Sequence, residues 1–372
     1  MVVADLYPAT RLGAAARAAA DSGLDALLLT PGADLRYLTG YAAHATERLT
    51  CLVLPAHGEP TLIVPRLERP AAEASPAPRT GVRIVDHPDG SDPYPLVAAA
   101  LRDITVRAVG LTDRMWAEQL LGLRDALPGV EQRLASTVLR DLRMRKSPAE
   151  VAALREAGAA IDAVHRRMAE WLRPGRTERQ VAADLAAAMR EAGHQTPEFA
   201  IVGSGPNGAS PHHTASDRVI EAGDPVVVDI GGVMPSGYRS DSTRTYVVGG
   251  AAPDGFADYY AALFEAQRAA VAAVRPGVSC ESVDAVARSM LTEAGYGEAF
   301  LHRTGHGIGL DGHEDPYLVA GNPLPLEPGM AFSIEPGVYL AGRHGARIED
   351  IVVCTADGVE RLNTLSTELV AL

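Results

Sequence analysis

The sequence lacks several features that mark particular classes of protein. Of its 372 residues one is a lysine, Lys146, three are cysteines and 5% are aromatic. The scarcity of lysine beside abundant arginine and alanine indicates a bias in genomic base composition. No apolar run reaches the roughly 20 residues that span a bilayer. The net charge of -13 argues against non-specific binding to nucleic acid or to an anionic membrane. A globular protein that binds neither is expected.

The three cysteines, Cys51, Cys280 and Cys354, are odd in number and far apart in the sequence. This pattern indicates reduced thiols that pack as small core residues, as is usual in the cytosol. The alanine-rich run of residues 14–20 has no basic segment before it and is interrupted by Arg17. It therefore predicts an amphipathic helix and not a signal peptide. We expect a cytoplasmic protein.

The pattern of apolar residues changes along the chain and predicts two domains. Residues 1–135 alternate strand-like runs, such as "LDALLLT" and "VRIVD", with helix-like runs such as "PYPLVAAALRD". This alternation predicts an α/β N-terminal domain. Residues 136–372 are predicted to form a second domain of α+β type.

The second domain is predicted to open with helices and to continue mainly as strands. Ser147 and Pro148 supply an N-cap and a first-turn proline for a helix that we expect to reach about Leu172. Further helices are expected over residues 177–193, 255–274 and 280–294. The segments between the later helices have the apolar runs and turn residues of strands and hairpins.

Two glycine-rich stretches match the dinucleotide-binding fingerprint but lack its structural context. The spacing G-x-G-x-x-G occurs from Gly307 to Gly312 and again from Gly203 to Gly208. The fingerprint requires a strand before it and a helix that opens on its last glycine. A proline-rich segment follows the first stretch and a loop-like segment follows the second. We therefore expect no nucleotide site.

Four carboxylates lie on predicted strands where apolar residues would be expected. Asp229 interrupts the apolar run "VVVDI", and Asp241 enters the second arm of the same predicted hairpin. Glu335 ends the apolar run "MAFSI", and Glu349 lies two residues after Arg347, on the same strand face. Burying a lone carboxylate is costly unless it is paired or bound to a cation.

Convergence of these four carboxylates would raise their pKa values by mutual repulsion. Two divalent cations would remove that conflict, because four carboxylates and one imidazole form an oxygen-rich ligand set suited to such ions. The stretch "HRTGHGIGLDGHE" contains three histidines among four glycines. The glycines are expected to let the backbone bend so that the rings reach one pocket. The sequence therefore predicts a dinuclear metal centre with a histidine ligand.

In their order and flanks, Asp229, Asp241, His306, Glu335 and Glu349 resemble the metal ligands of the pita-bread metallopeptidases, which include methionine aminopeptidase, aminopeptidase P and prolidase. "SDSTRTY", "GHGIG", "EPGVY" and "RIED" are similar to that family's ligand motifs. "RMRKSPAEVAALREA" resembles the start of its catalytic domain and "LDALLLTPGADLRYLTGY" its N-terminal domain. The resemblance implies a creatinase/prolidase-like α/β N-terminal domain followed by a pita-bread catalytic domain.

The resemblance also implies roles for individual residues. His212 resembles the histidine that stabilises the reacting carbonyl, and His302 and His313 resemble histidines that line the substrate subsites. Glu335 resembles the general base that takes a proton from water and returns it to the leaving nitrogen. Arg347 is expected to orient a ligand and to act with these catalytic residues. The expected substrate-binding residues are His212, His302, His313, Tyr317, Tyr339 and Arg347.

The implied activity is hydrolysis of the peptide bond before proline with two divalent metal ions, manganese preferred and cobalt or zinc as alternatives. An Xaa-Pro dipeptidase (prolidase) is favoured, and an Xaa-Pro aminopeptidase acting on longer peptides is the alternative. A creatinase-like amidinohydrolase and a non-catalytic binding protein would both be expected to lack the metal ligands present here. The substrates would be proline-containing di- or oligopeptides, and the family implies a homodimer.

One departure from the prolidase pattern bears on specificity. Prolidases that resemble this chain often carry an arginine shortly after the "HE" motif, where it can clamp the free carboxylate of a dipeptide. Here Tyr317 lies near that place, and a phenol offers one neutral donor where a guanidinium offers a bidentate fork. The carboxylate must use another cation, such as Arg343 or Arg347, or go unclamped. We expect soft selectivity between dipeptides and tripeptides.

Several other histidines carry no predicted function. His213 is interpreted as a neighbour of His212 and not as a catalyst. The following are expected to lie on the surface or to be hydrogen-bonded in the core: His44, His57, His87, His165 and His194.

Overall fold

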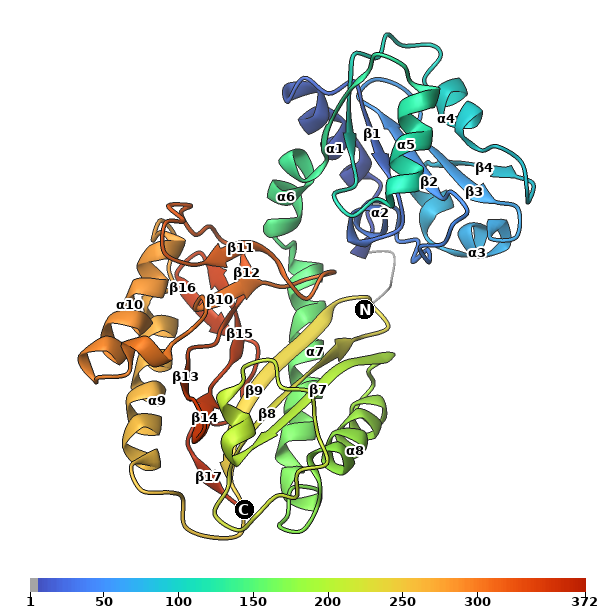
Figure 1. Cartoon of the computed structure of the whole chain (residues 1–372). Helices are drawn as coiled ribbons and strands as arrows, with labels where there is room; N and C mark the ends of the chain where they lie inside the picture. The colour runs from blue at the N-terminus through green and yellow to red at the C-terminus, as the bar shows by residue number, and fades with distance from the viewer. Residues whose placement is uncertain (1–5) are drawn as a thin grey trace. The chain divides into compact units, whose positions relative to one another are not determined.

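The computed structural model describes residues 6–372 and divides the chain into two compact units, Met1–Arg143 and Met144–Leu372. Each unit has its own sheets and its own core (Figure 1). Helix α6, Ser136–Met144, lies in the first unit except for its last residue, so the division falls after Arg143 and not after residue 135 as the sequence predicts.

The N-terminal unit is built on a six-stranded mixed sheet. Its strands are β1 Ala26–Leu29, β2 Cys51–Pro55, β3 Thr61–Pro65, β4 Arg83–His87, β5 Ala108–Leu111 and β6 Glu131–Leu134. Its other α-helices are α1 Thr10–Asp21, α2 Ala33–Thr39, α3 Arg69–Ala74, α4 Tyr94–Ala100 and α5 Ala117–Ala126. The strand order is β4-β3-β2-β1-β5-β6, with β1–β2 and β2–β3 antiparallel and the other pairs parallel.

The apolar runs of this unit explain its layers. Strands β1, β2 and β3 are buried along their whole length, as expected for strands covered on both faces of a sheet. Polar residues are frequent on β6, an edge strand of the sheet. The prediction of an α/β N-terminal domain is confirmed.

The C-terminal unit consists of long helices outside and strands between them. Its α-helices are α7 Pro148–Arg166, α8 Glu178–Glu191, α9 Phe256–Ala273 and α10 Cys280–Glu293, and its 3-10 turns are η3 Met168–Glu170, η4 Gly205–Ala209 and η5 Gly297–Ala299. Its first strands are β7 Thr196–Ser204, β8 Pro225–Val233, β9 Arg239–Val247, β10 Gly305–Gly307, β11 Glu314–Leu318 and β12 Ala331–Ile334. They are followed by β13 Gly337–Leu340, β14 His344–Arg347, β15 Asp350–Thr355, β16 Gly358–Arg361 and β17 Val370–Ala371.

Helix α7 begins as the sequence predicts. Ser147 caps it and forms a capping box with Glu150, with Pro148 in the first turn. The helix ends at Arg166, short of the predicted Leu172, because the chain tightens there into the 3-10 turn η3. No helix within residues 6–372 combines the length and the apolar composition needed to cross a membrane.

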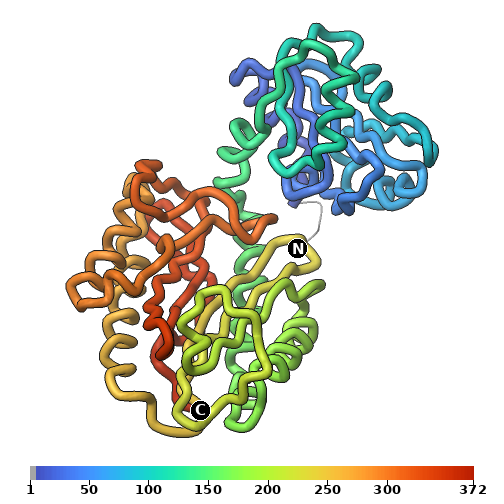
Figure 2. The backbone as a smooth tube through the Cα atoms, in the orientation of Figure 1, coloured from blue at the N-terminus to red at the C-terminus, as the bar shows by residue number. Residues whose placement is uncertain are grey.

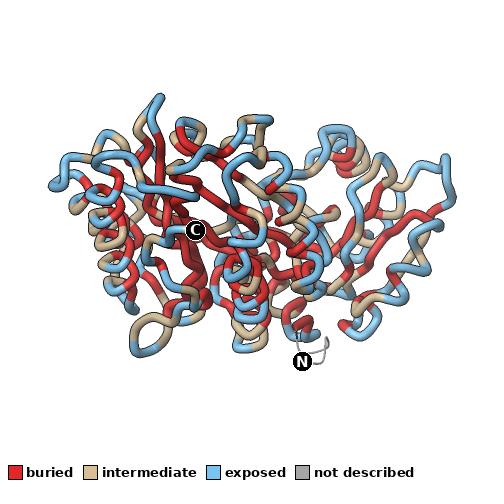
Figure 3. The backbone as a smooth tube through the Cα atoms, turned by 90° about the horizontal axis from the view of Figure 1, so that it is seen from below, coloured by how far each residue is buried: buried red, intermediate tan, exposed pale blue. Residues whose placement is uncertain are grey.

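Two helix pairs enclose the strands of the C-terminal unit. Helices α7 and α8 lie along one side of the strands, and α9 and α10 lie along the other (Figures 1 and 2). The strands form a four-stranded sheet β17-β9-β8-β7, a five-stranded sheet β11-β10-β12-β15-β16 and the hairpin β13-β14. Strands β8, β9, β12 and β15 are buried along nearly their whole length, and Figure 3 shows buried segments running through the interior of the molecule. Residues on β8, β9, β12 and β15 are therefore shielded from water.

Candidate metal centre

Two of the predicted ligands lie on one face of the hairpin β8–β9. Asp229 on β8 is opposite Thr243 on β9, and Asp241 on β9 is opposite Gly231. Because residues paired across strands and residues two apart share a face, the side chains of Asp229, Asp241 and Thr243 point to the same side. Both carboxylates are buried, at 8% and 7% exposed.

The other three ligands come from the five-stranded sheet. His306 lies in the middle of β10, Glu335 directly follows β12 and Glu349 directly precedes β15. Strands β12 and β15 are antiparallel with Ile334 opposite Asp350, so the two glutamates leave the same end of this pair. Strands β15 and β16 form an antiparallel hairpin, but Arg347 ends the separate strand β14, so the expectation that Arg347 and Glu349 share one strand is wrong.

The two sheets bring these side chains together. His306 Nε2 lies 3.1 Å from Glu335 Oε1 and 3.8 Å from Asp241 Oδ2. One ligand atom each from Asp241, His306 and Glu349 lies within 4.8 Å of the others. Ser333 links two members, since its hydroxyl donates to Glu335 Oε1 and accepts from the His306 N–H, each at 3.0 Å.

Burial and mutual repulsion act on the carboxylates of this cluster, and a bound cation would offset both effects. Burial, and then the charges of neighbouring carboxylates, raise the pKa of Asp241 and of Glu349 well above the ordinary range. Burial also raises the pKa of Asp229, against the opposing charge of Arg347. Glu335 differs, because its hydrogen bond to His306 and the nearby histidine charges outweigh burial and lower its pKa to about 2.

The arrangement fits divalent metal. Asp229 Oδ1 is buried without a hydrogen-bond partner among the described residues 6–372, and such an oxygen is costly unless something else binds it. Four carboxylates and one imidazole form a ligand set of the type that Mn, Co or Zn accepts. Metal ions would remove the mutual repulsion and satisfy the orphaned oxygen.

Arg347 and Tyr339 hold the ligands in place. Arg347 is 2% exposed, and its guanidinium donates to Asp229 Oδ2 at 2.6 Å, to Thr243 Oγ1 at 3.1 Å and to Tyr339 Oη at 2.8 Å. Thr243 in turn donates to Glu349 Oε2 at 2.7 Å. The sequence alone did not reveal Thr243, although it lies two residues after Asp241 on the same strand face.

Two histidines flank the cluster at different depths. His302 is partly buried; its Nε2 lies 2.8 Å from Tyr339 Oη, and burial lowers its pKa. His313 is exposed, and its ring centroid lies 3.9 Å from that of His306 in an edge-to-face contact. Desolvation of the His313 ring, and then the charge of His306, lower its pKa to about 4.

His212 and Tyr317 lie on segments next to the ligands. His212 is exposed in the loop after η4, and the carbonyl of its neighbour Pro211 accepts from Arg347 at 3.4 Å. Tyr317 on β11 is paired with His306, and the guanidinium of Arg303 lies 4.4 Å from its ring centroid.

A buried carboxylate that the sequence did not reveal holds the His212 loop. Glu178, the first residue of α8, accepts from the N–H and the hydroxyl of both Ser204 and Ser216 at 2.6–3.0 Å. It also accepts from Asn207 at 3.0 Å and contacts His213 Nε2 at 2.7 Å. The second histidine of the "HH" doublet is thus bound to Glu178, as a structural neighbour of His212.

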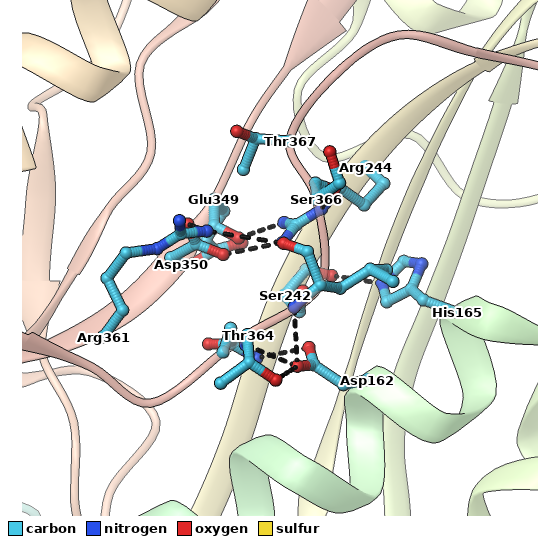
Figure 4. A network of polar contacts seen from close by, with 12 residues as sticks. Asp162, His165, Ser242, Arg244, Glu349, Asp350, Arg361, Thr364, Ser366 and Thr367 are labelled. Atoms are coloured by element: carbon cyan, nitrogen blue, oxygen red, sulfur yellow. Dashed lines mark hydrogen bonds and ion pairs between the residues drawn. The ribbon is translucent and has the colours of Figure 1, made fainter.

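A second ion pair fixes the backbone beside Glu349 (Figure 4). Arg244 on β9 binds Asp350 at 2.7 Å and donates to the carbonyls of Thr243 and Glu349 at 2.9 and 2.7 Å. Asp350 also binds Arg361 at 2.6 Å. Of the two adjacent acids in "RIED", Glu349 therefore faces the cluster and Asp350 is occupied by arginines.

The glycines around His306 serve close packing. Gly305, Gly307 and Gly309 do not have positive φ angles. A Cβ on Gly305 would overlap the Ser333 carbonyl, and one on Gly307 would overlap Asp315. The glycines allow neighbouring strands to approach His306, whereas the sequence argument expected them to let the backbone bend.

The histidines without a predicted function are exposed or have hydrogen-bond partners other than the proposed ligands. His165 contacts Tyr246 Oη at 2.9 Å, and burial lowers its pKa to about 3. His87 and His194 are buried and hydrogen-bonded to Leu49 O and Ser240 Oγ. His44 and His57 are exposed.

Comparison with known proteins agrees with this geometry. Residues 152–356 match metallopeptidase family M24, and residues 11–145 match the creatinase/prolidase N-terminal domain. The chain belongs to the M24 metallopeptidase family, which confirms the resemblance and the pita-bread fold class predicted from the sequence. It is a metal-dependent peptidase and therefore a hydrolase.

Relatives extend the match over almost the whole chain. The chain is 56% identical over 369 residues to a probable dipeptidase PepE of Mycobacterium tuberculosis, covering 99% of this chain and 97% of that protein. It is 35% identical over 356 residues to an Xaa-Pro dipeptidase of Lactobacillus helveticus, covering 94% and 95%. The crystal structure of dipeptidase PepE from Mycobacterium ulcerans superposes with a TM-score of 0.93 at 56% identity, covering 100% of this chain and 99% of that one.

Proposed function

We propose that the protein is an Xaa-Pro dipeptidase that uses two divalent metal ions, with manganese as the preferred metal. The observation that carries this proposal is the convergence of Asp241, His306 and Glu349 within 4.8 Å, next to Glu335 and to the orphaned oxygen of Asp229. The Lactobacillus helveticus relative, named an Xaa-Pro dipeptidase, supports the choice of substrate. We place the catalytic domain in residues 136–372 and an N-terminal α/β domain in residues 1–135.

The metal ligands in this proposal are Asp229, Asp241, His306, Glu335 and Glu349. When bound, divalent ions lower the pKa of water and polarise the scissile carbonyl. Two ions are proposed because five ligand side chains, four of them carboxylates, offer more oxygen atoms than one ion needs. Arg347 binds Oδ2 of Asp229, whereas Oδ1 has no hydrogen-bond partner among the described residues. Oδ1 is therefore the oxygen that we propose to bind metal.

Glu335 is the proposed general base and acid. One oxygen of its carboxylate can accept a proton from water and return it to the proline nitrogen as the C–N bond breaks. Ser333 holds Oε1 at 3.0 Å. This positioning limits the rotation of the carboxylate between the two proton transfers.

His212, His302 and His313 are proposed to hold the substrate carbonyl and to stabilise the charge that develops on it. The lowered pKa values of His302 and His313 indicate neutral rings, each of which has one N–H donor. Tyr339 and Arg347 act through other groups, since Tyr339 binds His302 and Arg347 binds Asp229. Their proposed role is to orient these residues.

The cation for a dipeptide carboxylate is proposed to be Arg303. Arg343 or Arg347 was expected to fill this role, but the Arg347 guanidinium is buried and binds Asp229, Thr243 and Tyr339. Arg303 stacks on Tyr317, the residue near the place where many prolidases carry an arginine. Its charge also contributes to the lowered pKa of His313. A single partly exposed guanidinium favours soft selectivity, with Xaa-Pro aminopeptidase activity on longer peptides as the second function.

The proposal also includes a cytoplasmic homodimer. Cys51, Cys280 and Cys354 are free and buried, which supports a reducing compartment. The dimer rests on the family resemblance.

Hydrolysis of an Xaa-Pro dipeptide by metal-loaded and metal-free protein tests the proposed function. Metal content measured by elemental analysis should approach two ions per chain, and exhaustive chelation should abolish hydrolysis. Full activity of verified metal-free protein would refute the proposal, and a stoichiometry of one would refute the dinuclear centre.

A further inference from the structure

The one lysine of the chain is buried against Glu314, the residue that follows His313. Lys146 Nζ lies 2.7 Å from Glu314 Oε1, and the two side chains are 1% and 9% exposed. Every other basic residue except histidine is an arginine. Because burying an ion pair removes the hydration of both charges, breaking such a pair leaves a costly unpaired charge. A buried lysine in this arginine-rich chain therefore points to a position that needs a compact ammonium group.

The carboxylate of Glu314 shapes the turn between β10 and β11. Its Oε2 accepts from the Asp311 N–H at 3.4 Å, and the Gly309 N–H donates to the Asp311 carbonyl at 3.0 Å. A Cβ on Gly309 would lie 2.7 Å from Glu314 Oε1. The carboxylate thus fills the space that a side chain on Gly309 would need, inside the turn that carries His313.

The ammonium group is presented from a fixed segment. The Lys146 N–H donates to the Gly329 carbonyl at 2.8 Å, and the next residue, Ser147, forms the capping box of α7 with Glu150. Lys146 can therefore anchor the Glu314 carboxylate, and His313, the residue before Glu314, contacts the His306 ring.

We propose that Lys146 and Glu314 are positioning residues for His313. The ammonium holds the Glu314 carboxylate inside the turn, and the turn holds the His313 imidazole against His306. This inference rests on the proposed function, in which His313 binds the substrate. It predicts that removing the charge of Lys146 lowers kcat/KM by displacing the His313 imidazole, and not by destabilising the whole protein.

A double-mutant comparison separates these two routes. Lys146→Met should lower kcat/KM for an Xaa-Pro dipeptide by about 10²-fold, the scale expected when a catalytic group is displaced by about 1 Å, with the metal content retained. Lys146→Met combined with His313→Ala should be no worse than His313→Ala alone, because both changes remove the same contribution. Lys146→Arg should not restore activity, since a planar guanidinium does not replace the compact ammonium.

Arg155→Met is the matched control. Arg155 forms an ion pair of 2.7 Å with Glu360, but both side chains are exposed, at 50% and 39%. The kcat/KM of this variant should stay within about twofold of wild type, because an exposed ion pair contributes little. In the double variant with His313→Ala, the two fold-changes in kcat/KM should multiply, as for independent sites. The inference is overturned if Lys146→Met stays within threefold of wild type, or if its effect multiplies with that of His313→Ala.

Chemical labelling provides a measurement that survives a failure of Lys146→Met to fold. Lys146 carries the only side-chain amine, so peptide mass spectrometry after treatment with acetic anhydride can follow acetylation at this one lysine. In folded metal-loaded wild type it should react at least ~10²-fold more slowly than in the unfolded chain, as a group that reacts only on local opening, and Glu314→Gln should accelerate the reaction. Reaction at the unfolded rate would refute the buried pair. If wild type cleaves no Xaa-Pro dipeptide, the proposed function fails, whereas labelling still decides the ion pair.

Discussion

Glu178 is predicted to make the stability of the protein depend on acidic pH. Burial raises its pKa, but hydrogen bonds from Ser216, Ser204 and Asn207 outweigh burial and lower the pKa from 4.5 to about 2. At 1.36 kcal/mol per pKa unit, this difference corresponds to about 3 kcal/mol of folding free energy. Because the pKa is lower in the folded state, the stabilisation is present above about pH 4.5 and is lost as the pH falls towards 2.

Glu178→Gln removes the titrating group and isolates this contribution. The free energy of unfolding of wild type should exceed that of the variant by at least about 3 kcal/mol at pH 6. The excess should shrink between pH 4.5 and 2.5 towards a pH-independent remainder from altered hydrogen bonds. Denaturant unfolding of the metal-free forms of both proteins measures it, so that loss of metal in acid does not enter the comparison.

The control for this experiment is Glu360→Gln, which removes an exposed carboxylate paired with Arg155 and should change stability by less than about 1 kcal/mol at any pH. If wild type exceeded Glu178→Gln in free energy of unfolding by the same amount at pH 6 and pH 3, the Glu178 carboxylate would not be held ionised by its hydrogen-bond donors. Because Glu178 holds the segment that carries His212, the variant should also lower kcat/KM.

Three further predictions concern the metal centre and its substrate. Exhaustive chelation should lower thermal stability as well as activity, because metal binding contributes to folded-state free energy; calorimetry that shows equal melting temperatures with and without metal would contradict this. Glu335→Gln should lower kcat by at least ~10²–10⁴-fold while His44→Ala has almost no effect, and equal effects would mean that the site is misplaced. Arg303→Met should raise KM for a free Xaa-Pro dipeptide about 10-fold, near 1.4 kcal/mol, but not for its C-terminal amide; a parallel rise for both would exclude Arg303 as the carboxylate cation.

The sequence revealed the proposed ligands because they conflict with their surroundings. Asp229 lies within an apolar strand and Glu335 at the end of one, where a carboxylate has no structural reason to be. The geometry brings Glu335 and His306 to 3.1 Å. The fold class was predictable for a related reason, since continuous buried runs such as β1–β3 and the capping box of α7 are local patterns.

The supporting residues escaped notice because each suits its local position. Thr243 is an ordinary strand residue, and only the pairing of β8 with β9 shows that it faces Glu349. Glu178 lies in the first turn of a helix, where an acidic residue complements the helix dipole. Nothing in that pattern indicates the donors that the segment 204–216 brings to it.

Arg347 and Lys146 show that even visible signals depend on tertiary contacts for their meaning. The two-residue spacing of Arg347 and Glu349 predicted one shared strand face, but Arg347 ends β14 and Glu349 lies just before β15. The spacing also could not show that the guanidinium binds Asp229, 118 positions away in sequence. Lys146 was conspicuous as the only lysine, and base composition explains why lysine is rare. It does not explain why the remaining one is buried 2.7 Å from the carboxylate beside His313. Lysine is rare in this chain and costly to bury, so the explanation for Lys146 lies in its contact with Glu314. That contact is visible only in the folded chain.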